Sequence, residues 1–205
     1  MPVISEKDAK RISRAIARAE KKTAGEIVAV LAERSDDYLF IPFLWAALAA
    51  LLVPIPLFLA SSLSAIEIYG AQLAAFALLA LPAAWMPLRV RLVPAAIRHA
   101  RAHRHAMEQF LAQNLHTTKG RTGVMIFVSL AERFAEVVAD EAIYAKVPPE
   151  TWEEIVAVLT DHIRKGETAA GFIEAVARCG ALLAEHFPPP EEPANQLPDH
   201  LIILE

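Results

Sequence analysis

Two uncharged apolar runs decide the organisation of the chain: LFIPFLWAALAALLVPIPLFLA at residues 39–60 and AQLAAFALLALPAAWMPL at residues 71–88. They have 22 and 18 residues, which correspond to roughly 33 and 27 Å of helix at about 1.5 Å per residue. The hydrocarbon core of a bilayer is about 30 Å thick. Core helices of a soluble protein are the alternative, but such helices usually keep a polar stripe. The runs therefore predict a two-helix transmembrane hairpin within residues 38–88.

The charges beside these runs predict an orientation. The connection at residues 61–70 has no Lys or Arg and one acid, Glu67, whereas arginines cluster after the second run. Cytoplasmic flanks carry an excess of Lys and Arg, so we expect an integral membrane protein with both termini in the cytoplasm. We also expect the cluster to face anionic lipid headgroups at about 1 kcal/mol per side chain; setting the topology alone is the simpler alternative. The cluster consists of Arg89, Arg91, Arg98, Arg101 and Arg104.

The composition and net charge of the chain limit the classes of molecule that it is expected to bind. Of the 205 residues 55% are hydrophobic, and the net charge is −4, so no large positive field favours the phosphate backbone of nucleic acids. The single cysteine, Cys179, cannot form an intramolecular disulfide. The polar stretch that begins at Ser5 lacks the apolar core of a secretory signal. We therefore expect the bilayer as a partner, and no nucleic acid.

The polar segment before the hairpin, residues 1–37, predicts one helix and one strand. Ser5 is placed as the N-cap, and Ile12 and Ile16 recur on one face. The many basic residues on the other faces allow a membrane-surface helix, but the thin, Ala-rich apolar face favours a helix docked on a sheet. Gly25 then ends the helix, and residues 26–32 form a strand.

The segment after the hairpin, residues 89–187, supplies the rest of the same domain. Its patterns predict a small mixed sheet flanked by helices, an α/β (α+β) fold with the membrane hairpin inserted between the first strand and the following helix. Residues 188–205 form a proline-rich tail that we expect to be extended or disordered, although residues 201–204 are apolar enough to dock. The expected elements are a helix at 95–115, a turn at 117–123, a strand hairpin at 124–128 and 134–139, and helices at 149–164 and 168–187.

Catalytic motifs are sparse. Cys179 has no nearby basic cradle and is interpreted as a small core residue. His99 and His103 have a zinc-compatible spacing, but no third ligand accompanies them. The segment 119–123 superficially resembles a phosphate loop, yet it leads into a strand and is interpreted as a turn. The residues alone thus indicate no catalytic residue and no cofactor site. Arg121 and Arg133 could engage an anionic partner, with a fold-supporting ion pair as the favoured alternative.

Four blocks of the sequence carry a family resemblance. They are Thr23-Ala24-Gly25-Glu26-Ile27, the stretch from Leu115 to Val124 (LHTTKGRTGV), Val128-Ser129-Leu130-Ala131-Glu132-Arg133, and the segment from Lys165-Gly166 to Gly171-Phe172. In this order they resemble the TPM domain family, and in particular its bacterial membrane members with a hydrophobic hairpin inside the domain. The resemblance covers most of residues 5–187.

The resemblance implies further properties. The family carries a phosphatase label from thylakoid acid phosphatase-like relatives, a link to photosystem repair, and binding of divalent cations such as calcium or magnesium by acidic residues. Soluble relatives have a Gly-Tyr-Gly turn after the second hairpin strand, where this chain has Ala139-Asp140-Glu141-Ala142-Ile143. If an acidic site is retained, its candidate metal ligands are Asp140 and Glu141, joined by Asp36 and Asp37.

Two functional hypotheses result. The leading one is a membrane-anchored, non-enzymatic interaction or assembly module at the cytoplasmic face, with another membrane protein as a possible partner. The competing one is a divalent-metal-dependent, phosphatase-like hydrolase. The first is favoured because no nucleophile is evident in the sequence.

Overall fold

The computed structural model describes residues 4–83, 86–189 and 197–204. The chain separates into two compact units. One unit combines Met1–Ser35 with Arg101–Glu205, and the other is Asp36–Ala100. The second unit therefore lies within the sequence of the first.

A four-stranded mixed sheet forms the centre of the first unit, as the sequence predicts. Its order is β3-β2-β1-β4. The central strands β1 (Glu26–Ala32) and β2 (Gly123–Ser129) are parallel, and all of their residues are buried, because apolar layers cover both faces. The strand β3 (Phe134–Ala139) pairs with β2 in the predicted antiparallel hairpin, and β4 (Leu201–Leu204) is parallel to β1.

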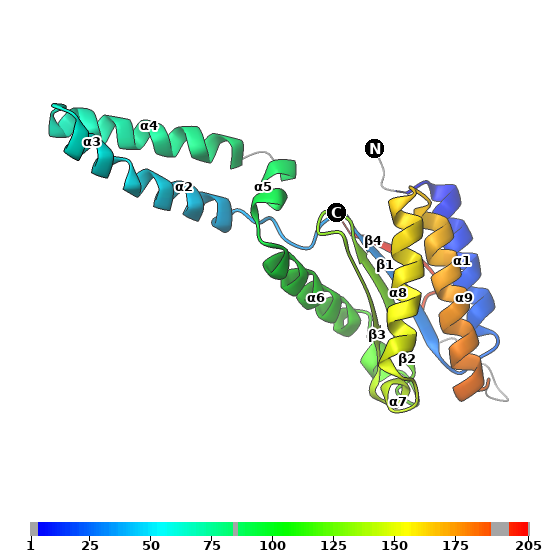
Figure 1. The fold of residues 1–205 in the computed structure, drawn as a ribbon. Coiled ribbons are helices and arrows are strands. Elements are labelled where there is room, and N and C mark those ends of the chain that lie inside the picture. The colour runs from blue at the N-terminus through cyan, green and yellow to red at the C-terminus, as the bar shows by residue number, and fades with distance from the viewer. Residues whose placement is uncertain (1–3, 84–85, 190–196, 205) are drawn as a thin grey trace. The chain divides into compact units, whose positions relative to one another are not determined.

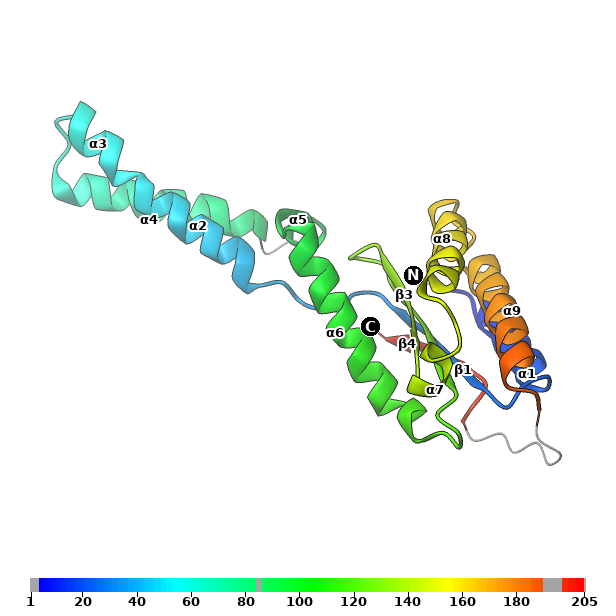
Figure 2. The ribbon, with the colours of Figure 1, turned by 60° about the horizontal axis from the view of Figure 1, so that its bottom comes forward.

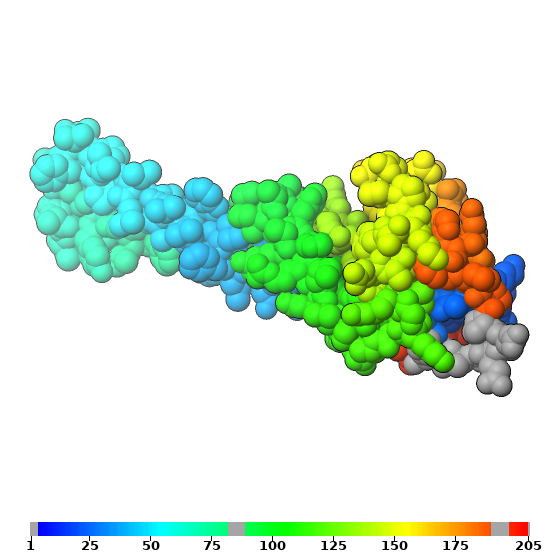
Figure 3. Space-filling view, turned by 90° about the horizontal axis from the view of Figure 1, so that it is seen from below, coloured from blue at the N-terminus to red at the C-terminus, as the bar shows by residue number. Residues whose placement is uncertain are grey.

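Three helices cover one face of this sheet: α1 (Glu6–Glu20), α8 (Pro149–Arg164) and α9 (Thr168–His186). Figure 1 shows them on the same side of the strands, and Figure 3 shows α8 and α9 side by side at the surface. Ser5 caps α1 by accepting a hydrogen bond from the Asp8 amide, as predicted. Because Ile12 and Ile16 are fully buried in the core, α1 is the docked helix and not a membrane-surface helix.

The other face is covered by α6 (Ala95–Ala112) and the short 3-10 helix η1 (Leu115–Thr117). Figure 2 shows α6 running along this side of the sheet. Ala106 and Phe110 of α6 pack in one apolar cluster with Val30 and Phe127 of the central strands. α6 ends three residues before the predicted Leu115, because Asn114 turns into the left-handed conformation at φ 58°.

Two elements were not predicted. The strand β4 arises from the expected tail, of which residues 190–196 lie outside the described part of the chain. A short helix, α7 (Glu141–Tyr144), follows β3, and Asp140 caps it by accepting a hydrogen bond from the Glu141 amide at 2.7 Å.

The second unit contains the apolar runs as helices α2 (Phe40–Leu52), α3 (Pro54–Ala60), α4 (Ala65–Ala83) and α5 (Met86–Leu92). α2 packs against α4, and the first run breaks at Val53, where the Val53-Pro54-Ile55-Pro56 step predicts a bend. α4 begins six residues before the predicted start, because the Ser64 amide donates to the Glu67 carboxylate at 2.8 Å. Residues 84 and 85 of the second predicted run lie outside the described residues.

Candidate functional sites

The surface of α2, α3 and the following part of α4 up to Leu81 is mostly apolar. Phe58 is 78% exposed and Leu59 is 79% exposed. By length and composition, one helix of the described residues, Phe40–Ala60, could cross a membrane, and only 11% of its most apolar window is buried. The apolar part of the second helix, Ala65–Leu81, is shorter. Of the two predicted membrane spans, only the first is therefore a helix long enough to meet the length criterion among the described residues.

The five arginines of the predicted cluster are divided between two helices, α5 and α6. The Arg89 guanidinium donates to the Asp37 carbonyl at 2.9 Å, so it connects the two ends of the inserted unit. Arg98 and Arg101 are half-buried on α6, whereas Arg91 and Arg104 are exposed. Contact of these side chains with anionic lipid stays a prediction.

His103, which the sequence offered as half of a zinc-compatible pair, contacts the side chain of Glu136. Its Nδ1 atom lies 2.9 Å from a carboxylate oxygen of Glu136 on β3. This contact ties the middle of α6 to the sheet hairpin. Among the described residues, no group of three or more His, Cys, Asp or Glu side chains could hold a metal ion.

The four acidic residues of the predicted cation site follow different strands. Asp140 and Glu141 come after β3, where the Asp140 amide donates to the carbonyl of Gly123 at the start of β2. Asp36 and Asp37 come after Ser35, whose hydroxyl contacts Ser129 at the end of β2. Asp36 and Asp37 belong to the other compact unit. A joint cation site of the four residues stays a prediction.

Asp140 has a structural role at its own end of the sheet. The side chain is 7% exposed, its Oδ1 atom caps α7, and the Arg121 guanidinium lies 3.8 Å away. Arg121 also donates to the His116 carbonyl at 2.8 Å. It adopts φ 56° beside Gly120 at φ 88°, so the segment 119–123 is the predicted turn and Arg121 has the predicted fold-supporting ion pair.

A carboxyl cluster that the sequence did not indicate joins the C-terminal segment to the start of β1. The Oε1 atom of Glu20 accepts a hydrogen bond from the Ile27 amide at 2.8 Å. The pKa of Glu20 is raised to about 9, and burial is the largest cause. The hydrogen bond with Asp199 and the charges of Glu26 and Asp199 also raise this pKa, whereas the hydrogen bond from the Ile27 amide lowers it. Glu20 is therefore protonated at neutral pH and can donate to Asp199. No local signal connects residues 20 and 199, because their contact requires the β1–β4 pairing.

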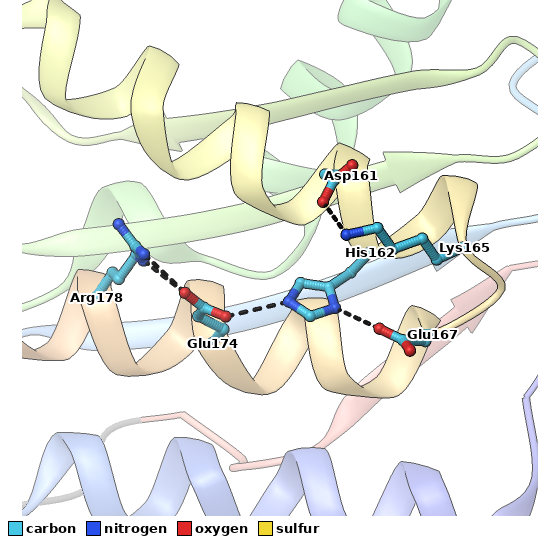
Figure 4. Close-up of polar contacts among 6 residues, drawn as sticks. All are labelled: Asp161, His162, Lys165, Glu167, Glu174 and Arg178. Atoms are coloured by element: carbon cyan, nitrogen blue, oxygen red, sulfur yellow. Dashed lines mark hydrogen bonds and ion pairs between the residues drawn. The ribbon is translucent and has the colours of Figure 1, made fainter.

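A second polar network joins α8 to α9 at the surface, as shown in Figure 4. The two ring nitrogens of His162 contact Glu167 at 2.9 Å and Glu174 at 3.1 Å. These hydrogen bonds raise the pKa of His162, Glu167 contributing most. Glu174 also accepts from Arg178 at 2.7 Å. The network is a helix-to-helix clamp whose charge depends on pH.

Cys179 is confirmed as a core residue. Its side chain is fully buried in α9, and burial raises the pKa of the thiol to about 12. At neutral pH the group is an uncharged thiol, which is a poor nucleophile.

These features define a class of protein: a mixed α/β domain with an apolar helical hairpin inserted after its first strand. The family model described as the TPM domain matches residues 87–182, from α5 into α9. The NMR structure of the BA42 protein from the psychrophilic bacterium Bizionia argentinensis has a similar fold, with a TM-score of 0.60. It is 18% identical, and the alignment covers 98% of this chain and 94% of BA42. No curated protein matches the sequence significantly.

Proposed function

We propose that this chain is a TPM-type domain that the α2–α4 hairpin anchors in a membrane, where it acts as a non-enzymatic interaction or assembly module. The observation that carries the proposal is the exposed apolar surface of the hairpin. Leu51, Leu52, Ile66 and Leu78 are each at least 62% exposed. Burial of one such side chain contributes about 1.5–3 kcal/mol, so hydrocarbon surroundings stabilise the hairpin strongly.

The dimensions of the helices agree with this environment. Phe40–Ala60 has 21 residues, which correspond to about 31 Å of helix. α4 has 19 residues, which correspond to about 28 Å. The first value lies close to the thickness of a bilayer core, whereas the apolar part of α4, Ala65–Leu81, is shorter. The arginines beyond α4 favour an orientation in which both termini are cytoplasmic.

Cysteine labelling tests both the anchoring and the orientation. Because Cys179 is fully buried, the parent chain is a low-background control for a membrane-impermeant maleimide. Ser62→Cys places a thiol in the connection between α3 and α4, and Lys7→Cys places one on α1. In intact cells or oriented vesicles we expect labelling of Ser62→Cys from outside, and labelling of Lys7→Cys only after permeabilisation. Extraction of the chain by alkaline carbonate, or equal labelling of both variants, would refute the proposal.

The hydrolase alternative gains no support from the acidic residues. Asp140, its central candidate, caps α7 and pairs with Arg121. We expect no hydrolysis of p-nitrophenyl phosphate by the purified chain with Mg²⁺, Ca²⁺ or Mn²⁺ present in turn. Metal-dependent turnover that is abolished in Asp140→Asn and retained in Glu153→Gln would favour the hydrolase.

The module role has its own test. Crosslinking of the full chain in native membranes should yield a discrete adduct with a membrane protein. A variant in which exposed side chains of the sheet domain are changed should lose that adduct and remain anchored. Absence of any reproducible adduct would contradict the module role without affecting the anchoring.

A further inference from the structure

A hollow of about 490 Å³ lies beside the β2–β3 turn. The residues that line it come from the end of β2, the turn, the start of β3 and the last part of α8. Leu130, Phe134 and Ile163 give it apolar walls, and Arg133 and Arg164 are its two cationic residues. Small-molecule sites in proteins have volumes of this order and combine mostly apolar walls with a few polar groups. In α/β sheets such sites occur outside the carboxyl ends of the strands.

The backbone at Arg133 is unusual for an arginine. Its φ is 53°, in the left-handed region, and its amide donates to the Leu130 carbonyl at 3.1 Å to close the turn. Glycine adopts this conformation without steric cost, whereas a residue with a Cβ atom is strained. The left-handed backbone of the turn therefore does not itself favour arginine at this position.

The acidic residues that neighbour the two arginines in the sequence have other partners. Glu132 is 1% exposed; it accepts hydrogen bonds from the Ser129 hydroxyl and from the Ser35 amide. Asp161 pairs with Lys165 at 2.6 Å. Within the described part of the chain, Arg133 and Arg164 make no hydrogen bond or ion pair with a carboxylate. Two arginines thus line one hollow without a carboxylate at ion-pair distance, and Asp161 acts on Arg164 only through longer-range electrostatic attraction.

We infer that this hollow binds a small organic carboxylate with an apolar body. Guanidinium groups match the geometry of a carboxylate through paired hydrogen bonds. The residues that line the hollow include two arginines and no acidic residue, so an anion complements their charge. Phe134, Leu130 and Ile163 provide the surface on which the apolar body packs. The inference does not depend on the anchoring or module role.

The test uses the full chain in zwitterionic nanodiscs and three probes: benzoate, benzyl alcohol, which has the ring without the charge, and acetate, which has the charge without the ring. We expect saturable benzoate binding, with amide chemical-shift changes at residues 129–135 and 160–164, and at least tenfold weaker binding of the other probes. Arg133→Gly and Arg164→Gln should each weaken benzoate binding about tenfold. Arg14→Gln, the same charge change on α1, should leave it unchanged.

Three results would overturn the inference. One is an absence of saturable shifts at these amides. The second is benzoate binding that both pocket variants retain in full. The third is shifts at these amides that require an anionic lipid in the nanodisc, because the hollow would then be a headgroup site. Arg133→Gly removes backbone strain, so loss of binding in that variant would not reflect unfolding.

Discussion

Substitution of Glu20 by Gln tests the carboxyl cluster between α1, β1 and the C-terminal segment. The pKa of Glu20 is raised from 4.5 to about 9 in the folded chain. A raised pKa means that the folded state holds its proton more tightly than the unfolded state. The resulting stability is fully present below pH 4.5 and is lost as the pH rises towards 9. Increasing pH should therefore weaken the attachment of the segment that carries Asp199.

The magnitude follows from linkage. The loss accumulates at about 1.4 kcal/mol for each pH unit above the unfolded pKa. At pH 7.5 this gives about 4 kcal/mol, and partial exposure of the side chain to water halves it to about 2 kcal/mol. Gln is neutral at every pH; its amide keeps an oxygen for the Ile27 amide and supplies a donor for Asp199. We thus expect Glu20→Gln to equal the parent at pH 5 and to exceed its stability by about 2 kcal/mol at pH 7.5.

Hydrogen exchange of the β4 amides measures this difference in the full chain. At pH 7.5 their protection factors in Glu20→Gln should exceed those of the parent about 30-fold, and at pH 5 the two should agree. Glu153→Gln, at an exposed position on α8, is the matched control and should change neither value. Equal protection of parent and Glu20→Gln at both pH values would refute the reasoning.

Three further predictions concern packing, strain and the surface clamp. Gly180→Val should lower the free energy of unfolding by about 1–3 kcal/mol, because a Cβ atom at Gly180 would lie 2.6 Å from the Cβ of Ala19. The control in the same thermal melts is Gly70→Ala, because a Cβ atom at Gly70 would meet open space. Arg133→Gly should raise the melting temperature through a gain of about 1 kcal/mol, because it removes a left-handed non-glycine residue; an unchanged or lower value would contradict the strain. In the parent, protonated His162 should stabilise the fold below pH 6.5, and this stability is lost as the pH rises through the raised pKa of His162. His162→Gln should abolish this pH-dependent contribution. Identical pH profiles of the melting temperature in parent and variant would exclude it.

Local signals accounted for much of the fold. The Ser5 cap needs only Asp8 three residues later, and the β2–β3 hairpin needs two apolar runs around one short turn. The interruption between α2 and α3 at Val53 follows from two nearby prolines. These features depend on neighbours in the sequence, so composition and spacing predict them. The start of α4 was missed because the apolar run is shorter than the helix, which Ser64 and Glu67 extend towards its N-terminus.

Long-range contacts explain what could not be predicted. The strand β4 forms because residues 201–204 pair with the free edge of β1, which lies about 170 positions earlier in the chain. The raised pKa of Glu20 depends on that pairing, since it brings Asp199 to the end of α1. The hollow with Arg133 and Arg164 likewise requires α8 to lie beside the β2–β3 turn.

The sequence by itself determined that an apolar hairpin interrupts one α/β domain, because uncharged runs of this length and strands with continuous apolar character are local properties of the chain. Only the tertiary structure decided which polar groups meet. It made Asp140 the cap of α7 and the partner of Arg121, and it placed Glu20 beside Asp199. The physical reason is that charge pairing and burial depend on distances in space, which the order of residues along the chain does not specify.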